Sequence, residues 1–132
     1  MDKKVKILDC TIRDGGYLNN WHFDLKLVRE LYRAHSKSGV DFVEIGFRST
    51  DKYFDPKKNG PWKFTSEQLA LEVVKGISGP DVALMVDFGK VDIEDIPARE
   101  NSIISMYRVA VNKDKAISAV DLCNEIADKR KN

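Results

Sequence analysis

The sequence predicts an α/β fold of four strand–helix units, equivalent to half of a (β/α)8 TIM barrel. Short apolar or alternating segments precede segments with helical spacing of apolar residues, and this succession recurs along the 132 residues. Strands that alternate with helices form a parallel sheet, because each crossover returns the chain across a sheet face. A complete barrel needs about 250 residues. We therefore expect residues 1–132 to be the N-terminal half of a barrel domain, with a small open doubly wound sheet as the alternative.

The first two units are predicted from strand patterns and helix caps. Residues 4–12 alternate as a strand, and Asp24 can cap a helix that Ser38-Gly39 ends. Residues 40–47 form the second strand, and Thr65 with Gln68 predicts a capping box. The apolar positions of these two helices are Leu25, Val28, Leu31, Tyr32, His35, Leu69, Val73 and Ile77.

The third and fourth units follow the same scheme. Residues 82–88 are mostly apolar, as a parallel strand covered on both faces should be. Residues 93–96 predict only a short helical turn, because Pro97 cannot lie inside a longer helix. Residues 104–111 form the fourth strand and residues 115–129 the fourth helix. The predicted inner stripe of this last helix is Ile117, Val120, Cys123 and Ala127.

Composition disfavours several classes of function. Lys and Arg number 22 against 21 Asp and Glu, so no net field attracts nucleic acid or an anionic membrane. No apolar run approaches the roughly 20 residues that cross a bilayer, and the first residues do not resemble a signal peptide. We expect a cytoplasmic protein, in which Cys10 and Cys123 are reduced, buried and structural.

The densest polar cluster, DCTIRDGGY, occupies residues 9–17. In parallel α/β folds the carboxyl ends of the strands form the active-site face, which favours a catalytic interpretation. Gly15 and Gly16 would let the backbone turn sharply after Asp14. The other interpretation is a strand end with an Arg–Asp ion pair and no further role.

Glu44 lies inside an otherwise apolar strand. A carboxylate there is costly unless it is paired or binds a metal ion, so it is either a buried structural pair, for instance with Arg13, or a functional group. Gly46 on the same face would leave space for a neighbouring side chain or ligand. Asp87 and Arg108 are similar polar residues in the later strands. We expect these side chains to surround one end of the sheet.

The segment DCTIRDGG at residues 9–16 resembles the D-x-T-x-R-D-G signature of the metallolyase TIM barrels. That family includes 4-hydroxy-2-oxovalerate aldolase, 3-hydroxy-3-methylglutaryl-CoA lyase, and the isopropylmalate and homocitrate synthases. VEIGF at residues 43–47 and YRVAV at residues 107–111 fall where the family has similar segments. The resemblance implies a divalent-metal-dependent aldolase or lyase that cleaves a carbon–carbon bond through a pyruvate-type enolate. A Claisen-type acyl-CoA transferase and a non-catalytic half-barrel that acts by association are alternatives.

The resemblance also implies roles for particular residues. Asp14 would be a ligand of Mg²⁺ or Mn²⁺, and Arg13 would stabilise the enolate oxygen of a small 2-oxo acid. Tyr17 stands where the aldolase branch has a histidine base, and would act in proton transfer. The supporting residues would be Asp9, Glu44 and Arg108.

The implied metal site is incomplete in this sequence. The family completes it with a His-x-His pair, whereas His22 and His35 are the chain's two histidines and do not form such a pair. His22 is a second candidate base, although a lone loop histidine is usually incidental. Exposed sheet edges favour a homo-oligomer that supplies what is missing. The long aromatic loop at residues 48–64 would shape a pocket or pack against another chain.

Overall fold

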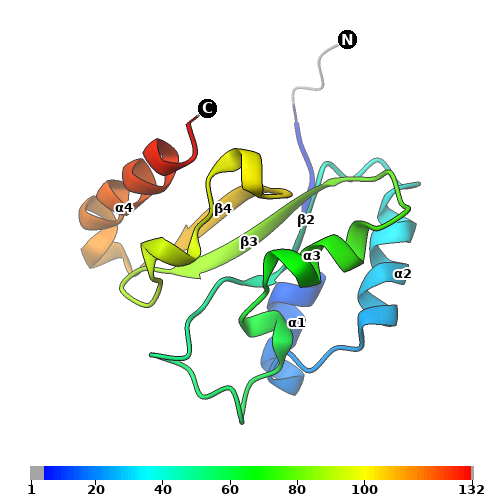
Figure 1. The fold of residues 1–132 in the computed structure, drawn as a ribbon, viewed down its shortest axis with the longest axis horizontal. Coiled ribbons are helices and arrows are strands. Elements are labelled where there is room, and N and C mark those ends of the chain that lie inside the picture. Colours follow the sequence, from blue (N-terminus) through cyan, green and yellow to red (C-terminus); the bar gives the residue numbers. More distant parts are fainter. Residues whose placement is uncertain (1–4, 132) are drawn as a thin grey trace.

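The computed structural model describes residues 5–131, in which one parallel sheet has the strand order β1–β2–β3–β4 (Figure 1). The α/β class predicted from the sequence is confirmed, and the arrangement is consistent with half of a TIM barrel. The strands are β1 (Leu8–Asp9), β2 (Phe42–Phe47), β3 (Asp81–Asp87) and β4 (Ile104–Ala110). The helices are α1 (Thr11–Asn19), α2 (Leu25–His35), α3 (Glu67–Val74) and α4 (Ala116–Lys129).

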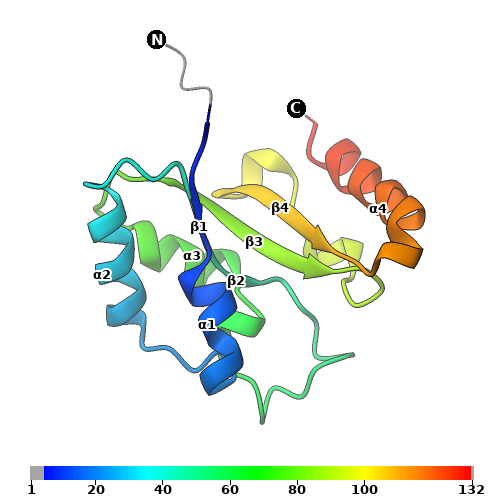
Figure 2. The same ribbon diagram turned by 180° about the vertical axis from the view of Figure 1, so that it is seen from behind.

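The helices surround the sheet unevenly. Figure 1 is seen from the side that α3 covers, whereas Figure 2 brings β1 and α1 to the front. Helix α2 packs beside α3, and α4 lies alongside β4 on the far side of the molecule from α2. The predicted turn after β3 is confirmed as a 3-10 helix, Ile93–Asp95. Within the described residues, none of the helices has the length and apolar character needed to cross a membrane.

The first segment departs from the prediction of a strand over residues 4–12. Residue 4 lies outside the described residues, and only Leu8–Asp9 pairs with β2. The Asp9 carboxylate accepts hydrogen bonds from the Thr11 backbone N–H (3.1 Å) and the Thr11 hydroxyl (2.7 Å). These bonds turn the chain away from the sheet and into α1, because such local bonds compete with strand pairing. From Thr11 onward, the signature segment therefore lies on a helix.

The predicted turn at Gly15 and Gly16 is also wrong, since both residues lie within α1. The turn comes later, where Asn20 (φ 53°) and Trp21 (φ 61°) adopt left-handed conformations. Gly16 instead allows close packing of the Trp21 side chain. A Cβ atom there would come within 2.0 Å of the Trp21 ring, so the missing side chain lets the indole lie against the helix.

The core forms around β2 and β3. Val43, Ile45 and Phe47 are fully buried, and Trp62 packs in the same cluster. Gly46 leaves space as predicted, and the space is filled by the Trp62 carbonyl group, which would lie 2.1 Å from an added Cβ atom. The loop after β2 is thereby held close against the sheet.

The caps and faces of two helices differ from the sequence prediction. Ser66 rather than Thr65 caps α3, by accepting a hydrogen bond from the Leu69 N–H (3.1 Å). Thr65 is buried and donates its hydroxyl hydrogen bond to the Trp62 carbonyl group. The predicted capping box is therefore displaced by one residue, and the helix ends at Val74 rather than at residue 77.

Helix α4 turns a different face inward than expected. Its buried residues are Ala119 and Ile126, whereas Ile117 of the predicted stripe is 88% exposed. Cys123 is exposed and Cys10 is partly buried, and both are free thiols. The prediction of two buried cysteines is therefore wrong for Cys123.

Candidate functional site

Four charged residues form a continuous group that we call the Arg13 network: Arg13, Asp14, Glu44 and Arg108. Glu44 on β2 is completely buried. Its Oε1 accepts hydrogen bonds from Arg13 Nε (2.7 Å) and Arg108 Nη2 (2.8 Å), and its Oε2 accepts one from Arg108 Nε (2.7 Å). Arg13 Nη1 in turn donates to Asp14 Oδ1 at 3.0 Å. The structure thus joins α1, β2 and β4 and pairs Glu44 with Arg13, as one of the two interpretations predicted.

The network keeps both guanidinium groups charged. Burial acts to lower the pKa of Arg13, but the hydrogen bond and charge of Glu44 outweigh it and raise that pKa above its ordinary value. The hydrogen bond to Glu44 is the largest cause that raises the pKa of Arg108. Two cations therefore share one buried carboxylate, and the exposed Asp14 supplies the second negative charge of the network.

The other predicted site residues lie around this network in different settings. Asp14 has a side chain that is 68% exposed, so its carboxylate is open to solvent or a ligand. Tyr17 is 66% exposed, and its ring packs against Trp21 in a T-shaped arrangement with a centroid distance of 4.8 Å. Asp9 holds the start of α1, and its Oδ2 lies 3.4 Å from His35 Nε2. Asp9 is thus engaged at the helix start.

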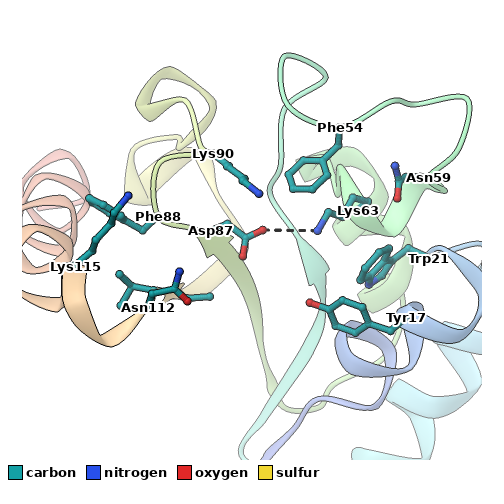
Figure 3. A pocket seen from close by; sticks show the side chains of 12 residues that line it. Tyr17, Trp21, Phe54, Asn59, Lys63, Asp87, Phe88, Lys90, Asn112 and Lys115 are labelled. Carbon is teal, nitrogen blue, oxygen red and sulfur yellow. Dashed lines mark ion pairs between the residues drawn. The ribbon is translucent and has the colours of Figure 1, made fainter.

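A cavity of about 580 Å³, which we call the strand-end cavity, opens at the carboxyl ends of β3 and β4 (Figure 3). Tyr17 and Trp21 line it from the α1 side, and Phe54 and Asn59 belong to the loop at residues 48–64. The expectation that this loop shapes a pocket is thereby confirmed. The remaining lining residues are Lys63, Asp87, Phe88, Lys90, Ala110, Val111, Asn112 and Lys115.

Three lysines of this cavity, Lys63, Lys90 and Lys115, were not predicted from the sequence, and Lys63 is the buried one. It is only 3% exposed, and its Nζ lies 3.7 Å from Asp87 Oδ2. The same Nζ lies 3.7 Å from the centroid of the Phe47 ring, 4.1 Å from that of Phe54 and 4.4 Å from that of Trp21. Asp87 therefore pairs with Lys63 rather than joining the Arg13 network.

Burial is the largest cause that lowers the pKa of Lys63 below its ordinary value. The Asp87 carboxylate acts in the opposite direction, whereas the nearby Lys90 adds to the lowering. The sequence does contain one indication, because Lys63 stands between Trp62 and Phe64. A lysine flanked by large aromatic residues is a candidate for burial.

The metal-binding capacity of the described residues is small. Within residues 5–131, no three His, Cys, Asp or Glu side chains gather closely enough to hold a metal ion. Asp14 offers one accessible carboxylate. His22 is exposed and does not belong to the lining of the strand-end cavity, so the structure does not bring this alternative base to the candidate site.

Comparison with known proteins identifies a similar solved structure, the N-terminal domain of a putative aldolase from Bacteroides vulgatus. The match has a TM-score of 0.74 and 26% sequence identity, and covers 95% of this chain but 42% of that one. This chain therefore spans less than half the length of its structural neighbour. No family model and no curated protein matches the sequence. The likeness supports an aldolase-like fold in general terms.

Proposed function

We propose that this chain supplies part of the active site of an aldolase or lyase that acts on a carbon–carbon bond of a small 2-oxo acid through a pyruvate-type enolate. The observation that carries the proposal is the Arg13 network, in which a buried carboxylate holds two charged guanidinium groups beside the exposed Asp14. The likeness to an aldolase domain supports the same class of reaction.

Arg13 is the residue to which we assign enolate stabilisation. Its charge persists because Glu44 raises its pKa. Its direction is fixed by two hydrogen bonds, from Nε to Glu44 and from Nη1 to Asp14. A guanidinium that is oriented before the reaction stabilises developing negative charge without reorganising. Arg108 acts through Glu44 and is a positioning residue.

Asp14 suits one ligand position of a divalent cation, because hard cations prefer carboxylate oxygens and this carboxylate is accessible. The described residues of one chain do not complete such a site. We therefore propose that a second copy of the chain supplies the other ligands. A bound Mg²⁺ or Mn²⁺ would polarise the carbonyl group of the 2-oxo acid as a Lewis acid. Tyr17, one helical turn beyond Asp14, is the proposed proton-transfer group.

Calorimetric titration of Mn²⁺ in the presence of oxalate, an enolate mimic, tests the proposal. We expect saturable binding to the wild-type chain that is lost in Asp14→Asn. The matched control is Asp121→Asn, since Asp121 is an exposed carboxylate on α4; this variant should bind like wild type. Exchange of the pyruvate methyl protons in D₂O with Mg²⁺, followed by NMR, reports the enolate itself. Wild-type protein that neither binds Mn²⁺ nor accelerates exchange would contradict the metal-dependent reaction.

A further inference from the structure

We infer that Lys63 captures small oxo acids as a Schiff base in the strand-end cavity. This reaction needs no metal ion, so the inference goes beyond the enolate chemistry proposed for Arg13 and Asp14 and does not rest on it. It rests on the position of one buried amine between a carboxylate, a second lysine and three aromatic rings.

The geometry around Lys63 provides a nucleophile and a proton acceptor together. Figure 3 shows the Lys63 and Lys90 amino groups both directed toward Asp87 across the opening of the cavity. Asp87 Oδ2 is 3.7 Å from Lys63 Nζ, close enough to take its proton after a small movement. A lysine becomes a useful nucleophile when it is desolvated or lies beside another cation, and Lys63 meets both conditions.

The surroundings of Lys63 favour its neutral amine form, but they can also stabilise a positive charge on the same nitrogen. Burial lowers the pKa of Lys63, and Lys90 lowers it further. The rings of Trp21, Phe47 and Phe54 attract the cationic form. The product of Schiff-base formation is also a cation at the same nitrogen, so these rings stabilise the protonated imine as they stabilise the ammonium group.

The substrate class follows from the rest of the lining. Three lysines and one aspartate line the cavity, so its walls carry excess positive charge and favour an anionic ligand. Lys90 and Lys115 remain to pair with a carboxylate when Lys63 holds the carbonyl carbon. A volume of about 580 Å³ accommodates a small molecule. These features together favour a small aldehyde or ketone that bears a carboxylate.

The proposed reaction balances without any further reagent. Asp87 takes a proton from the Lys63 ammonium group, and the amine attacks the carbonyl carbon while the carbonyl electron pair moves to oxygen. A proton passes from nitrogen to this oxygen, which gives a carbinolamine. The protonated Asp87 then returns its proton to the hydroxyl group, which leaves as water while the C=N bond forms. The net change is ammonium plus carbonyl to protonated imine plus water.

Borohydride trapping tests this inference. The whole chain is incubated with pyruvate or glyoxylate, EDTA and sodium borohydride, and the reduced adduct is measured by intact mass and located by peptide mapping. We expect most of the adduct at Lys63 and none at this position in Lys63→Arg, which keeps the charge. Lys113→Arg, at an exposed lysine outside the cavity lining, is the matched control and should trap like wild type.

A second variant keeps the test decisive if Lys63→Arg does not fold. Asp87→Asn retains the amine but loses the proton acceptor, and should slow trapping at Lys63 by about a hundredfold. Adduct spread evenly over surface lysines, or pyruvate binding without any reducible adduct, would overturn the inference. Because EDTA is present in the trapping experiment, a failure to trap at Lys63 would not contradict the metal-dependent proposal. In the same way, a chain that shows no Asp14-dependent Mn²⁺ binding could still be trapped at Lys63.

Discussion

Glu44 is the fully buried residue of the Arg13 network, and its carboxylate is the counter-charge of both Arg13 and Arg108. In Glu44→Gln both guanidinium groups lose their shared counter-charge. Breaking a buried pair from one side costs about 3–5 kcal/mol, and we expect the free energy of unfolding in urea to fall by that order.

The control for Glu44 is a carboxylate in an exposed pair. Glu30 lies 3.7 Å from Arg33, and both side chains are largely exposed. Glu30→Gln should change the free energy of unfolding by less than about 1 kcal/mol. Equal stability of the Glu44→Gln and Glu30→Gln chains would show that the network is not held as the structure indicates.

Lys63 should titrate below the ordinary lysine pKa of 10.5, since burial and Lys90 outweigh Asp87. Reductive ¹³C-methylation followed by NMR titration measures this pKa, with the Lys63→Arg chain identifying the resonance. In the pH window below 10.5 the folded state binds fewer protons at Lys63 than the unfolded state. The contribution of Lys63 to the free energy of unfolding therefore rises with pH there. A titration at or above 10.5 would contradict the prediction.

Glu44 and Lys63 show which roles of single residues could be predicted from the sequence. Glu44 was identifiable because a carboxylate in an apolar strand needs a partner, and Arg13 was the partner expected. Lys63 was not identified, because the groups around it come from the turn after α1, from β2 and β3, and from the long loop. Only the folded chain brings these segments together.

Among the secondary-structure elements, α1 shows most clearly how tertiary packing overrides local pattern. Residues 4–12 alternate like a strand and two adjacent glycines suggest a turn, yet the helix begins at Thr11 and continues through both. Asp9 starts the helix by binding Thr11, and Trp21 fixes it by donating an indole hydrogen bond to the Arg13 carbonyl group at 2.8 Å. The polar signature was found from sequence, but its helical setting was not.

The two glycines of α1 make a matched test of this packing. Gly16→Ala should lower the free energy of unfolding by about 1–3 kcal/mol, because its Cβ would overlap the Trp21 ring. Gly15→Ala meets only Phe23 Cζ at 3.4 Å, so it should be neutral or stabilise by up to about 1 kcal/mol through helix propensity. Urea denaturation compares the two variants. A Gly16→Ala chain as stable as Gly15→Ala would contradict the packing described.

At the scale of the whole molecule, the sequence predicted the parallel sheet well because strands 2 to 4 are strongly apolar segments. Those three strands begin and end within two residues of their expected positions. The inner face of α4 was mispredicted, because its apolar residues occur on more than one side and packing turns Ala119 and Ile126 inward. Periodicity predicts that a helix has an apolar face, but the neighbouring elements decide which face is buried.

The sheet of the described residues leaves β1 and β4 each paired on one side, and open edges of this kind favour pairing with another chain. Helix α4 lies beside β4 (Figure 2), so β1 is the more accessible edge. Ile7, directly before β1, is 51% exposed. We predict concentration-dependent association of the chain, measured by analytical ultracentrifugation.

A charge placed next to this edge should weaken association, because an unpaired lysine opposes strand-to-strand contact. Ile7→Lys is expected to raise the dissociation constant about tenfold, equivalent to about 1.4 kcal/mol. The matched control is Leu71→Lys, since Leu71 is 42% exposed on α3, away from either edge. If both variants associate like wild type, pairing does not occur through β1. A wild-type chain that stays monomeric at every concentration would exclude self-association as the source of the missing metal ligands.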